Sequence, residues 1–325
     1  MRKTKKYAKR RFMRFTVLIV ICIFTSALAI HLIGNNPFNP KSVDPILTKE
    51  EILANYMDKL NIDKTLPVIT VDQNGQGDFV TINAAIKHIS DASIQAIIFV
   101  QSGDYIENLS LIGSTATIII GENVTETKII SYDDDYYHPP MEVSGNAIFA
   151  NIQFLALRPE IPKSSKSKFQ TYAVHIDFPG EGKIIFQDCV LFSAFNSGVG
   201  IGTHENQTIQ FSSTMIMTDE QNSSAFYAHN NIASDVKNQN IIIDGATLYS
   251  EYSHGLRIDD ANQFFGNSYG NDMTFSINNS TVRSGNSDVS PVYFLTDPKP
   301  GLQLSGCIKL SPTSSGNSTD MLNYK

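Results

Sequence analysis

The sequence has 325 residues, a formal net charge of −7 and 42% hydrophobic residues, which is enough apolar material for one sizeable core. The acidic balance argues against a nucleic-acid partner. Tryptophan is absent.

The N-terminus combines a basic cluster with an apolar run. Eight Lys and Arg residues within positions 2–14 precede an uncharged stretch from Phe15 to Gly34. A basic cluster alone is typical of a nucleic-acid arm, but the apolar run indicates a secretory signal or a membrane anchor at residues 1–34. Ala27–Ala29 offers a cleavage site, whereas the continuation past it favours an anchor through residues 15–34. The flanking charge predicts a cytoplasmic N-terminus and an extracytoplasmic body, secreted or anchored.

Residues 35–66 read as a linker that carries a short helix at Thr48–Leu60 and holds the body off the membrane. The folded body is expected at residues 67–312. It opens with a strand at Val68, a Gly-rich turn and an amphipathic helix at Thr81–Ser90. The turn lacks the lysine pattern of a phosphate loop, so we expect the helix to cap the first turn of a solenoid. The polar tail, residues 313–325, is expected to be disordered.

The centre of the chain repeats one pattern. Alternating apolar runs recur as IIFQDCVLFS, IQFSSTMIMT, IIIDGATLYS and FSINNSTVRS, which begin at residues 184, 209, 241 and 275. Taking Phe186, Phe211, Ile243 and Ile277 as equivalent, the steps are 25, 32 and 34 residues. Strand-sized runs with Gly, Asn, Asp and Ser at the breaks, and no helical period, predict a solenoid of parallel strands.

A second short run in each turn sets the register. In this register all its inward positions are apolar, whereas a slip by one residue would bury His, Asp and Arg side chains. This contrast supports the chosen register. The ten predicted inward residues are Val174, Ile176, Val199, Ile201, Phe226, Ala228, Leu256, Ile258, Val292 and Phe294. Cys189 falls in mid-strand, where a buried free thiol is expected rather than a bridge to Cys307.

Several segments resemble the pectinesterase family, within the pectin-lyase-like group of proteins. The matching pieces are DQNGQGDFVTINAAIKHI at 72–89, GDYIE at 103–107, IIIGENVTETKII at 118–130 and QTYAVHIDFPGEGKIIFQDCVLFSAFNSGV at 170–199. The resemblance covers roughly residues 68–260. It implies an all-β, right-handed parallel β-helix and a metal-independent hydrolysis of polysaccharide methyl esters by two Asp residues.

The family's central motifs are altered in this chain. The segment that matches the motif of the acid–base Asp reads Phe195-Asn196-Ser197-Gly198, and Ala225 stands at the position of the nucleophilic Asp. Of the family's Leu-Gly-Arg-Pro-Trp motif only Gly255-Leu256-Arg257 remains. The standard mechanism is therefore not expected.

An outward row of polar and aromatic residues on the second strands is the candidate site. One column holds His175, Gly200, Tyr227, Arg257 and Tyr293, and the next holds Asp177, Gly202, His229, Asp259 and Leu295. The two glycines predict a dent in this row. His229 beside Asp259 predicts a pair able to act as a base near neutral pH, with Arg257 as the third catalytic residue.

The remaining residues of the row, His175, Asp177, Tyr227 and Tyr293, are predicted to bind the substrate. The interpretation without function is that these outward side chains are only solvated. His and Asp are suitable metal ligands, but the glycine turn separates them by about two strand spacings, so neither a metal nor a cofactor is expected.

Two functions follow from this reading. The first is a carbohydrate-active enzyme of pectinesterase-like descent, with ester hydrolysis as the leading chemistry and a polysaccharide, including an acidic one, as partner. The second is an inactive glycan-binding surface protein. A purely structural stalk is less consistent with a polar, dented face. The chain is expected to be a monomer, and nucleic acid is not among its partners.

Overall fold

The computed structural model describes residues 47–132, 138–158, 171–202, 204–229, 238–259, 273–294, 301–310 and 320–321. The chain divides into two compact units, Met1–Thr48 and Lys49–Lys325, and every element below belongs to the second. The predicted membrane segment, residues 15–34, lies outside the described residues and stays a prediction. Within the described ranges, no helix combines the length and the apolar character that crossing a membrane requires.

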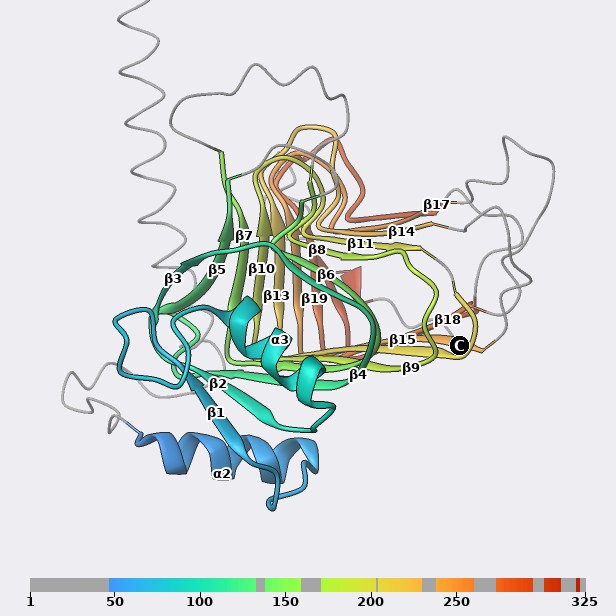
Figure 1. The fold of residues 1–325 in the computed structure, drawn as a ribbon. Coiled ribbons are helices and arrows are strands. Elements are labelled where there is room, and N and C mark those ends of the chain that lie inside the picture. The colour runs from blue at the N-terminus through green and yellow to red at the C-terminus, as the bar shows by residue number, and fades with distance from the viewer. Residues whose placement is uncertain are drawn as a thin grey trace, which may run out of the picture. The chain divides into compact units, whose positions relative to one another are not determined.

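Turns of the chain stack as parallel strands on three faces, as the sequence predicts (Figure 1). Face A consists of the first halves of β4 (Leu109–Gly121) and β6 (Met141–Ala150), then β8 (Val174–Ile176), β11 (Val199–Gly202), β14 (Phe226–His229), β17 (Leu256–Asp259) and β20 (Val292–Phe294). Face B consists of β1 (Val68–Val71), β2 (Ile97–Val100), the second halves of β4 and β6, β9 (Gly182–Gln187), β12 (Gln207–Ser212), β15 (Gln239–Asp244), β18 (Met273–Asn278) and β21 (Gly301–Ser305).

Face C completes each turn. It consists of β3 (Gly103–Ile106), β5 (Thr127–Ser131), β7 (Gln153–Ala156), β10 (Val190–Ser193), β13 (Met215–Thr218), β16 (Thr247–Ser250), β19 (Thr281–Ser284) and β22 (Ile308–Leu310). Because the chain visits face B, face C and face A in turn, the fold is a parallel β-helix, and strands far apart in sequence become neighbours.

The predicted register is confirmed. Phe211 pairs with Phe186 and with Ile243, and Ile243 pairs with Ile277. On face A, the inward residues of β8, β11, β14 and β17 are at most 1% exposed. Stacked rings continue this core along the axis, since the Phe186 ring lies 4.9 Å from Phe149 and 5.1 Å from Phe211. The alternation of apolar and polar residues therefore determines which side chains reach the outside of face A.

A column of left-handed residues forms the corner between face B and face C. Their φ angles lie between 47° and 63° at Asn151, Asp188, Ser213, Gly245, Asn279 and Gly306. Gly, Asn and Asp tolerate this conformation better than other residues, which explains the polar or Gly positions in the middle of each repeat. Successive strands can thus turn sharply at the same height in every turn.

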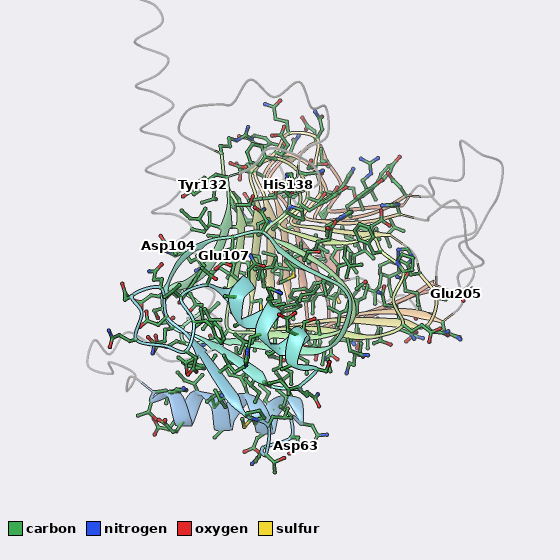
Figure 2. All side chains as sticks on the ribbon, in the orientation of Figure 1. Asp63, Asp104, Glu107, Tyr132, His138 and Glu205 are labelled. Carbon is green, nitrogen blue, oxygen red and sulfur yellow. The ribbon has the colours of Figure 1, made fainter. Side chains whose placement is uncertain are left out.

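Helix α3 (Ile82–Ala92) covers the first turn, close to the predicted range. Its residues Ile82, Ala85 and Ile89 are buried in the main core. Thr81 caps its N-terminus, and the Glu107 carboxylate accepts hydrogen bonds of 2.9 Å from the backbone N–H groups of both Ile82 and Asn83. Glu107 is labelled next to the helix in Figure 2. The Gly-Asp-Tyr-Ile-Glu segment therefore holds the cap in place.

Helix α2 (Lys49–Leu60) lies within one residue of the predicted helix, but it is no spacer. Its buried residues pack on outward side chains of face B, including Ile97 and Phe99 of β2. The Tyr56 hydroxyl and the Lys59 ammonium bind the Asp188 carboxylate at 3.1 and 2.7 Å. The expected linker at 35–66 therefore has its second half inside the folded body, because β2 is apolar on both sides and needs a cover.

At the C-terminal end, Asp320–Met321 form strand β23, antiparallel to β22. These two residues of the tail that we expected to be disordered are thus paired. Cys189 and Cys307 are buried and free, as predicted. Burial raises the pKa of Cys189 to about 12, which keeps its thiol protonated.

Candidate functional site

The outward row of face A is assembled as predicted. Gly200 of β11 pairs with His175 on one side and with Tyr227 on the other, Tyr227 pairs with Arg257, and Arg257 pairs with Tyr293. Glu142 of β6 pairs with His175 and extends the row by one strand, which the sequence reasoning missed. Six consecutive strands therefore place these positions in one line along the axis.

Arg257 lies between two tyrosine rings. Its guanidinium carbon is 5.6 Å from the ring centre of Tyr227 and 5.7 Å from that of Tyr293. Two hydrogen bonds of 2.9 and 3.0 Å run from its Nε to Asp259, and its Nη2 lies 2.6 Å from Oδ2 of the same carboxylate. Burial alone would lower the pKa of Arg257, but the bonds to Asp259 outweigh this effect and raise it. Arg257 is a fixed cation with flat apolar faces on either side.

The predicted pair of His229 and Asp259 needs correction. The two residues are register partners. The Asp259 carboxylate, however, is engaged through both oxygens by Arg257, which projects from the same side of β17 two residues earlier. Among the residues that the structure describes, the carboxylate next to His229 is that of Asp177, whose Oδ2 lies 3.7 Å from Nε2 of His229. Asp259 pairs with Arg257 because a guanidinium is a stronger hydrogen-bond donor to a carboxylate than the imidazole of His229, and can bind both of its oxygens.

Asp177 is the centre of a histidine cluster, which we define as His175, His204 and His229 around this carboxylate. Nε2 of His175 lies 3.8 Å from Oδ2, and Nε2 of His204 lies 3.5 Å from Oδ1. The other ring nitrogen of His175 is 3.1 Å from the Glu142 carboxylate. The four side chains of the cluster are 5% to 17% exposed. Three imidazoles from different turns thus share one half-enclosed carboxylate.

The predicted dent at Gly200 is filled. A Cβ at Gly200 would lie 2.6 Å from the ring of Tyr172, which therefore occupies the space that the glycine leaves. The Tyr172 ring stacks on His175, with centroids 5.1 Å apart and an interplanar angle of 9°. At Gly200 the expectation of a hollow was wrong, because a glycine in a stacked sheet admits a neighbouring ring as readily as a ligand; at Gly202 it stays a prediction.

Two histidines of the site were missed in the sequence. His204 follows β11 in a short connection, and only folding brings it next to Asp177. His254 stacks on Tyr293 at 4.8 Å, and its Nδ1 lies 2.6 Å from the Ser290 carbonyl, to which it donates. Burial lowers the pKa of His254, which favours the neutral ring. In the sequence, His254 could have been recognised as a site residue from its position directly before Gly255-Leu256-Arg257.

Ala225 and Asn196, which the sequence resemblance matches with the two Asp residues of the pectinesterase family, are not acidic residues. Ala225 is fully buried directly before β14, and its N–H donates to the His254 carbonyl at 3.0 Å. Asn196 lies in the connection between face C and face A, where its side chain accepts from the Ser197 N–H. Neither residue supplies a carboxylate to face A, and among the described residues the histidine cluster is the group on this face that is suited to acid–base chemistry.

The chemistry available at the site is acid–base and stacking. The described part of the chain contains no group of three or more His, Cys, Asp or Glu side chains placed to hold a metal ion. The histidine cluster offers imidazoles next to a carboxylate, which is the usual composition of a general acid–base site. Beside it, rings and a guanidinium form a flat stack suited to the apolar faces of sugar rings.

No protein-family model and no curated protein matches this sequence. Solved structures do match, and several are pectin methylesterases, the family that the sequence resembles. Pectin methylesterase PemA from Erwinia chrysanthemi is 10% identical, with a TM-score of 0.43 over 78% of this chain and 91% of that chain. The pectin methylesterase from Yersinia enterocolitica is 14% identical, with a TM-score of 0.47 over 74% and 93%.

A viral protein, ORF18 of Geobacillus virus E2, is 13% identical, with a TM-score of 0.48 over 84% of this chain and 53% of that chain. These identities are informative about the fold alone, and TM-scores of this size support no further argument. The evidence for the fold is therefore the pairing of the strands, and the evidence for function is the arrangement of side chains on face A.

Proposed function

We propose that this protein binds a polysaccharide along face A and hydrolyses ester groups on it, outside the cytoplasm. The observation that carries the proposal is the juxtaposition of two arrangements on one surface. A stack of His254, Tyr293, Arg257 and Tyr227 suits sugar rings. Beside it, Tyr227 lies 5.4 Å from His229 of the histidine cluster. The basic and apolar N-terminus supports the extracytoplasmic location.

His229 is the acid–base group in this proposal. Its neutral imidazole accepts a proton from a water molecule while the water oxygen forms a bond to the ester carbonyl carbon. The imidazolium then returns this proton to the alcohol oxygen as the bond from carbon to that oxygen breaks. Asp177, 3.7 Å from Nε2, stabilises the imidazolium between the two steps. Arg257, whose charge is balanced by Asp259, lies on the same face between the Tyr227 and Tyr293 rings and helps to hold them in place for the sugar.

A second function, glycan binding without turnover, is favoured by one observation. The Asp259 carboxylate is neutralised by Arg257, and Ala225 is buried, so face A lacks a free carboxylate at both positions where the sequence reasoning looked for one. In this case the stacked face would hold the sugar chain and the histidine cluster would only shape its edge. Such a protein would bind and release its glycan unchanged.

Release of methanol and acetate from a panel of esterified polysaccharides distinguishes the two functions. The full chain should release one of these products, and His229→Gln should lose about 100-fold or more of the rate, the usual contribution of a general acid–base group, while binding is retained. His88→Gln, an exposed position on the capping helix α3, is the matched control and should keep full activity. Binding without release would support the second function. No binding and no release would overturn both.

A further inference from the structure

The turn between β1 and α3 carries a reactive pair of residues at its tip. Asn74 is followed by Gly75, and this is the single Asn-Gly step in the sequence. Residues 73–76 form a tight turn, in which both Asn74 and Gly75 are exposed. An asparagine in this position is open to attack by the backbone nitrogen that follows it, because glycine has no side chain to hinder the approach.

The surroundings of Gly75 are open as well. Its φ angle is +81°, and a Cβ placed on this residue would meet no heavy atom within 4 Å. Glycine also adopts the backbone angles of a strained turn more easily than other residues. Every other asparagine of the sequence is followed by a residue with a side chain, which crowds the same approach. Asn74 therefore differs from the other asparagines in both the chemistry and the space around it.

We infer that Asn74 is a site of spontaneous deamidation, at which the folded chain converts to aspartate and isoaspartate without an enzyme. The backbone nitrogen of Gly75 forms a bond to the side-chain amide carbon of Asn74. The amide nitrogen leaves as ammonia and takes the proton that the Gly75 nitrogen gives up. Water then opens the cyclic imide that remains. Opening at one carbonyl gives aspartate, and opening at the other gives isoaspartate, in which the backbone continues through the side chain.

Asp72 slows this conversion in the folded chain. The Gly75 N–H donates to the Asp72 carbonyl at 2.9 Å, and the Asn74 N–H donates to Oδ1 of the same residue at 2.8 Å. Asp72 is 3% exposed, and its own N–H donates to the Phe79 carbonyl at 2.9 Å, so it is fixed in place. The Gly75 nitrogen has to leave its hydrogen bond before it can attack. The rate of deamidation is therefore set by how often the turn opens.

Deamidation acts on the turn in two ways. Aspartate adds a negative charge two residues after Asp72, and like charges in one turn repel each other. Isoaspartate adds one carbon atom to the backbone inside a turn that the Gly75 N–H closes. The far side of the turn has no room to adjust, because a Cβ at Gly77 would lie 2.6 Å from the Thr70 carbonyl oxygen. Both products therefore loosen the turn that leads into the capping helix.

The test follows the full chain during prolonged incubation at pH 8. Peptide mapping by mass spectrometry locates each amide that has become an acid, and labelling with an isoaspartyl methyltransferase counts the isoaspartate. We expect the peptide with Asn74 to convert first, and about fivefold or more faster when guanidinium chloride unfolds the chain, since a hydrogen bond of ordinary strength contributes such a factor. Asn74→Gln should abolish the early isoaspartate. Asn222→Gln, at an exposed asparagine followed by serine, is the matched control and should leave it unchanged.

Two variants of Asp72 test its role in the rate. Asp72→Ala removes the acceptor of the Asn74 N–H and should speed deamidation about fivefold or more, whereas Asp72→Asn keeps an oxygen there and should stay within about twofold of the wild type. A variant that had lost its fold would also convert faster at Asn222, so the ratio of the two rates separates a loosened turn from an unfolded chain. Conversion that begins at another asparagine would overturn the site. An equal ratio in the wild type and Asp72→Ala would overturn the control by Asp72.

Discussion

Asp219 provides a direct test of how burial acts on charge in this fold. It follows β13, and its Oδ1 is buried without a hydrogen-bond partner among the described residues. Burial raises the pKa of Asp219 from 3.8 to about 6, although the nearby Arg158 opposes the rise. Asp219→Asn keeps the size of the side chain and removes its charge, so it isolates the free energy of ionising this carboxyl group.

The sign follows from proton binding. Between pH 4 and pH 6 the folded chain keeps a proton on Asp219 that the unfolded chain has lost, so stability falls as the pH rises through this window. The gap between 3.8 and about 6 corresponds to about 3 kcal/mol above pH 6, as an upper value. The penalty is absent below the unfolded pKa. Asp219→Asn should therefore match the wild type at pH 4 and exceed its stability at pH 8.

Unfolding by urea at pH 4, 6 and 8 measures this difference. We expect the variant to be about 2 kcal/mol more stable at pH 8, in the size range of a carboxyl group moved out of water. Asp91→Asn is the matched control, since Asp91 is exposed and pairs with Lys87 one helical turn away, and its effect should stay within about 0.5 kcal/mol at every pH. Equal stability of Asp219→Asn and wild type at all three pH values would refute the argument.

Three further substitutions test the scaffold by thermal and urea unfolding. Gly200→Ala should cost about 1–3 kcal/mol, because the new Cβ would lie 2.6 Å from the Tyr172 ring; an unchanged midpoint would mean that Tyr172 does not fill this space. Gly245→Ala should cost about 1 kcal/mol through backbone strain alone, as its φ is +61° and nothing crowds it within 3.4 Å, whereas an unaffected variant would contradict the left-handed corner. Glu107→Gln should cost about 1 kcal/mol by weakening the charged cap of α3, and a neutral result would show that Thr81 suffices.

The register was predictable because it depends on a two-residue period that stacking enforces in every turn. The inward residues of β8, β11, β14 and β17 are buried as expected, and a shift by one would have placed His175 and Arg257 in the apolar core instead. The left-handed corner was visible as Asn, Asp, Ser or Gly in mid-repeat. The alternation and the corner residues are both local in sequence and recur in every turn, so each repeat supports the assignment made for the others.

The partners within the site were not predictable in the same way. Register places His229 beside Asp259, but the choice among nearby carboxylates is decided by donors that compete for them. Arg257 takes Asp259 with three close contacts, and His229 is left near Asp177. Tyr172 and His204 lie in connections whose lengths differ from turn to turn, so no period reports where their rings will lie.

The neutralised Arg257 connects the scaffold to the chemistry. If Asp259 were free, face A would carry a second carboxylate next to His229, besides Asp177, and a guanidinium ready for an anionic sugar. Because Arg257 and Asp259 pair within β17, and the guanidinium lies between the rings of Tyr227 and Tyr293, Arg257 acts on a ligand mainly by holding these two rings in place. The polar groups of face A that are not occupied by Arg257 are then those of the histidine cluster. The side chains that would move the proton in ester hydrolysis therefore lie beside the ring stack that would hold the sugar.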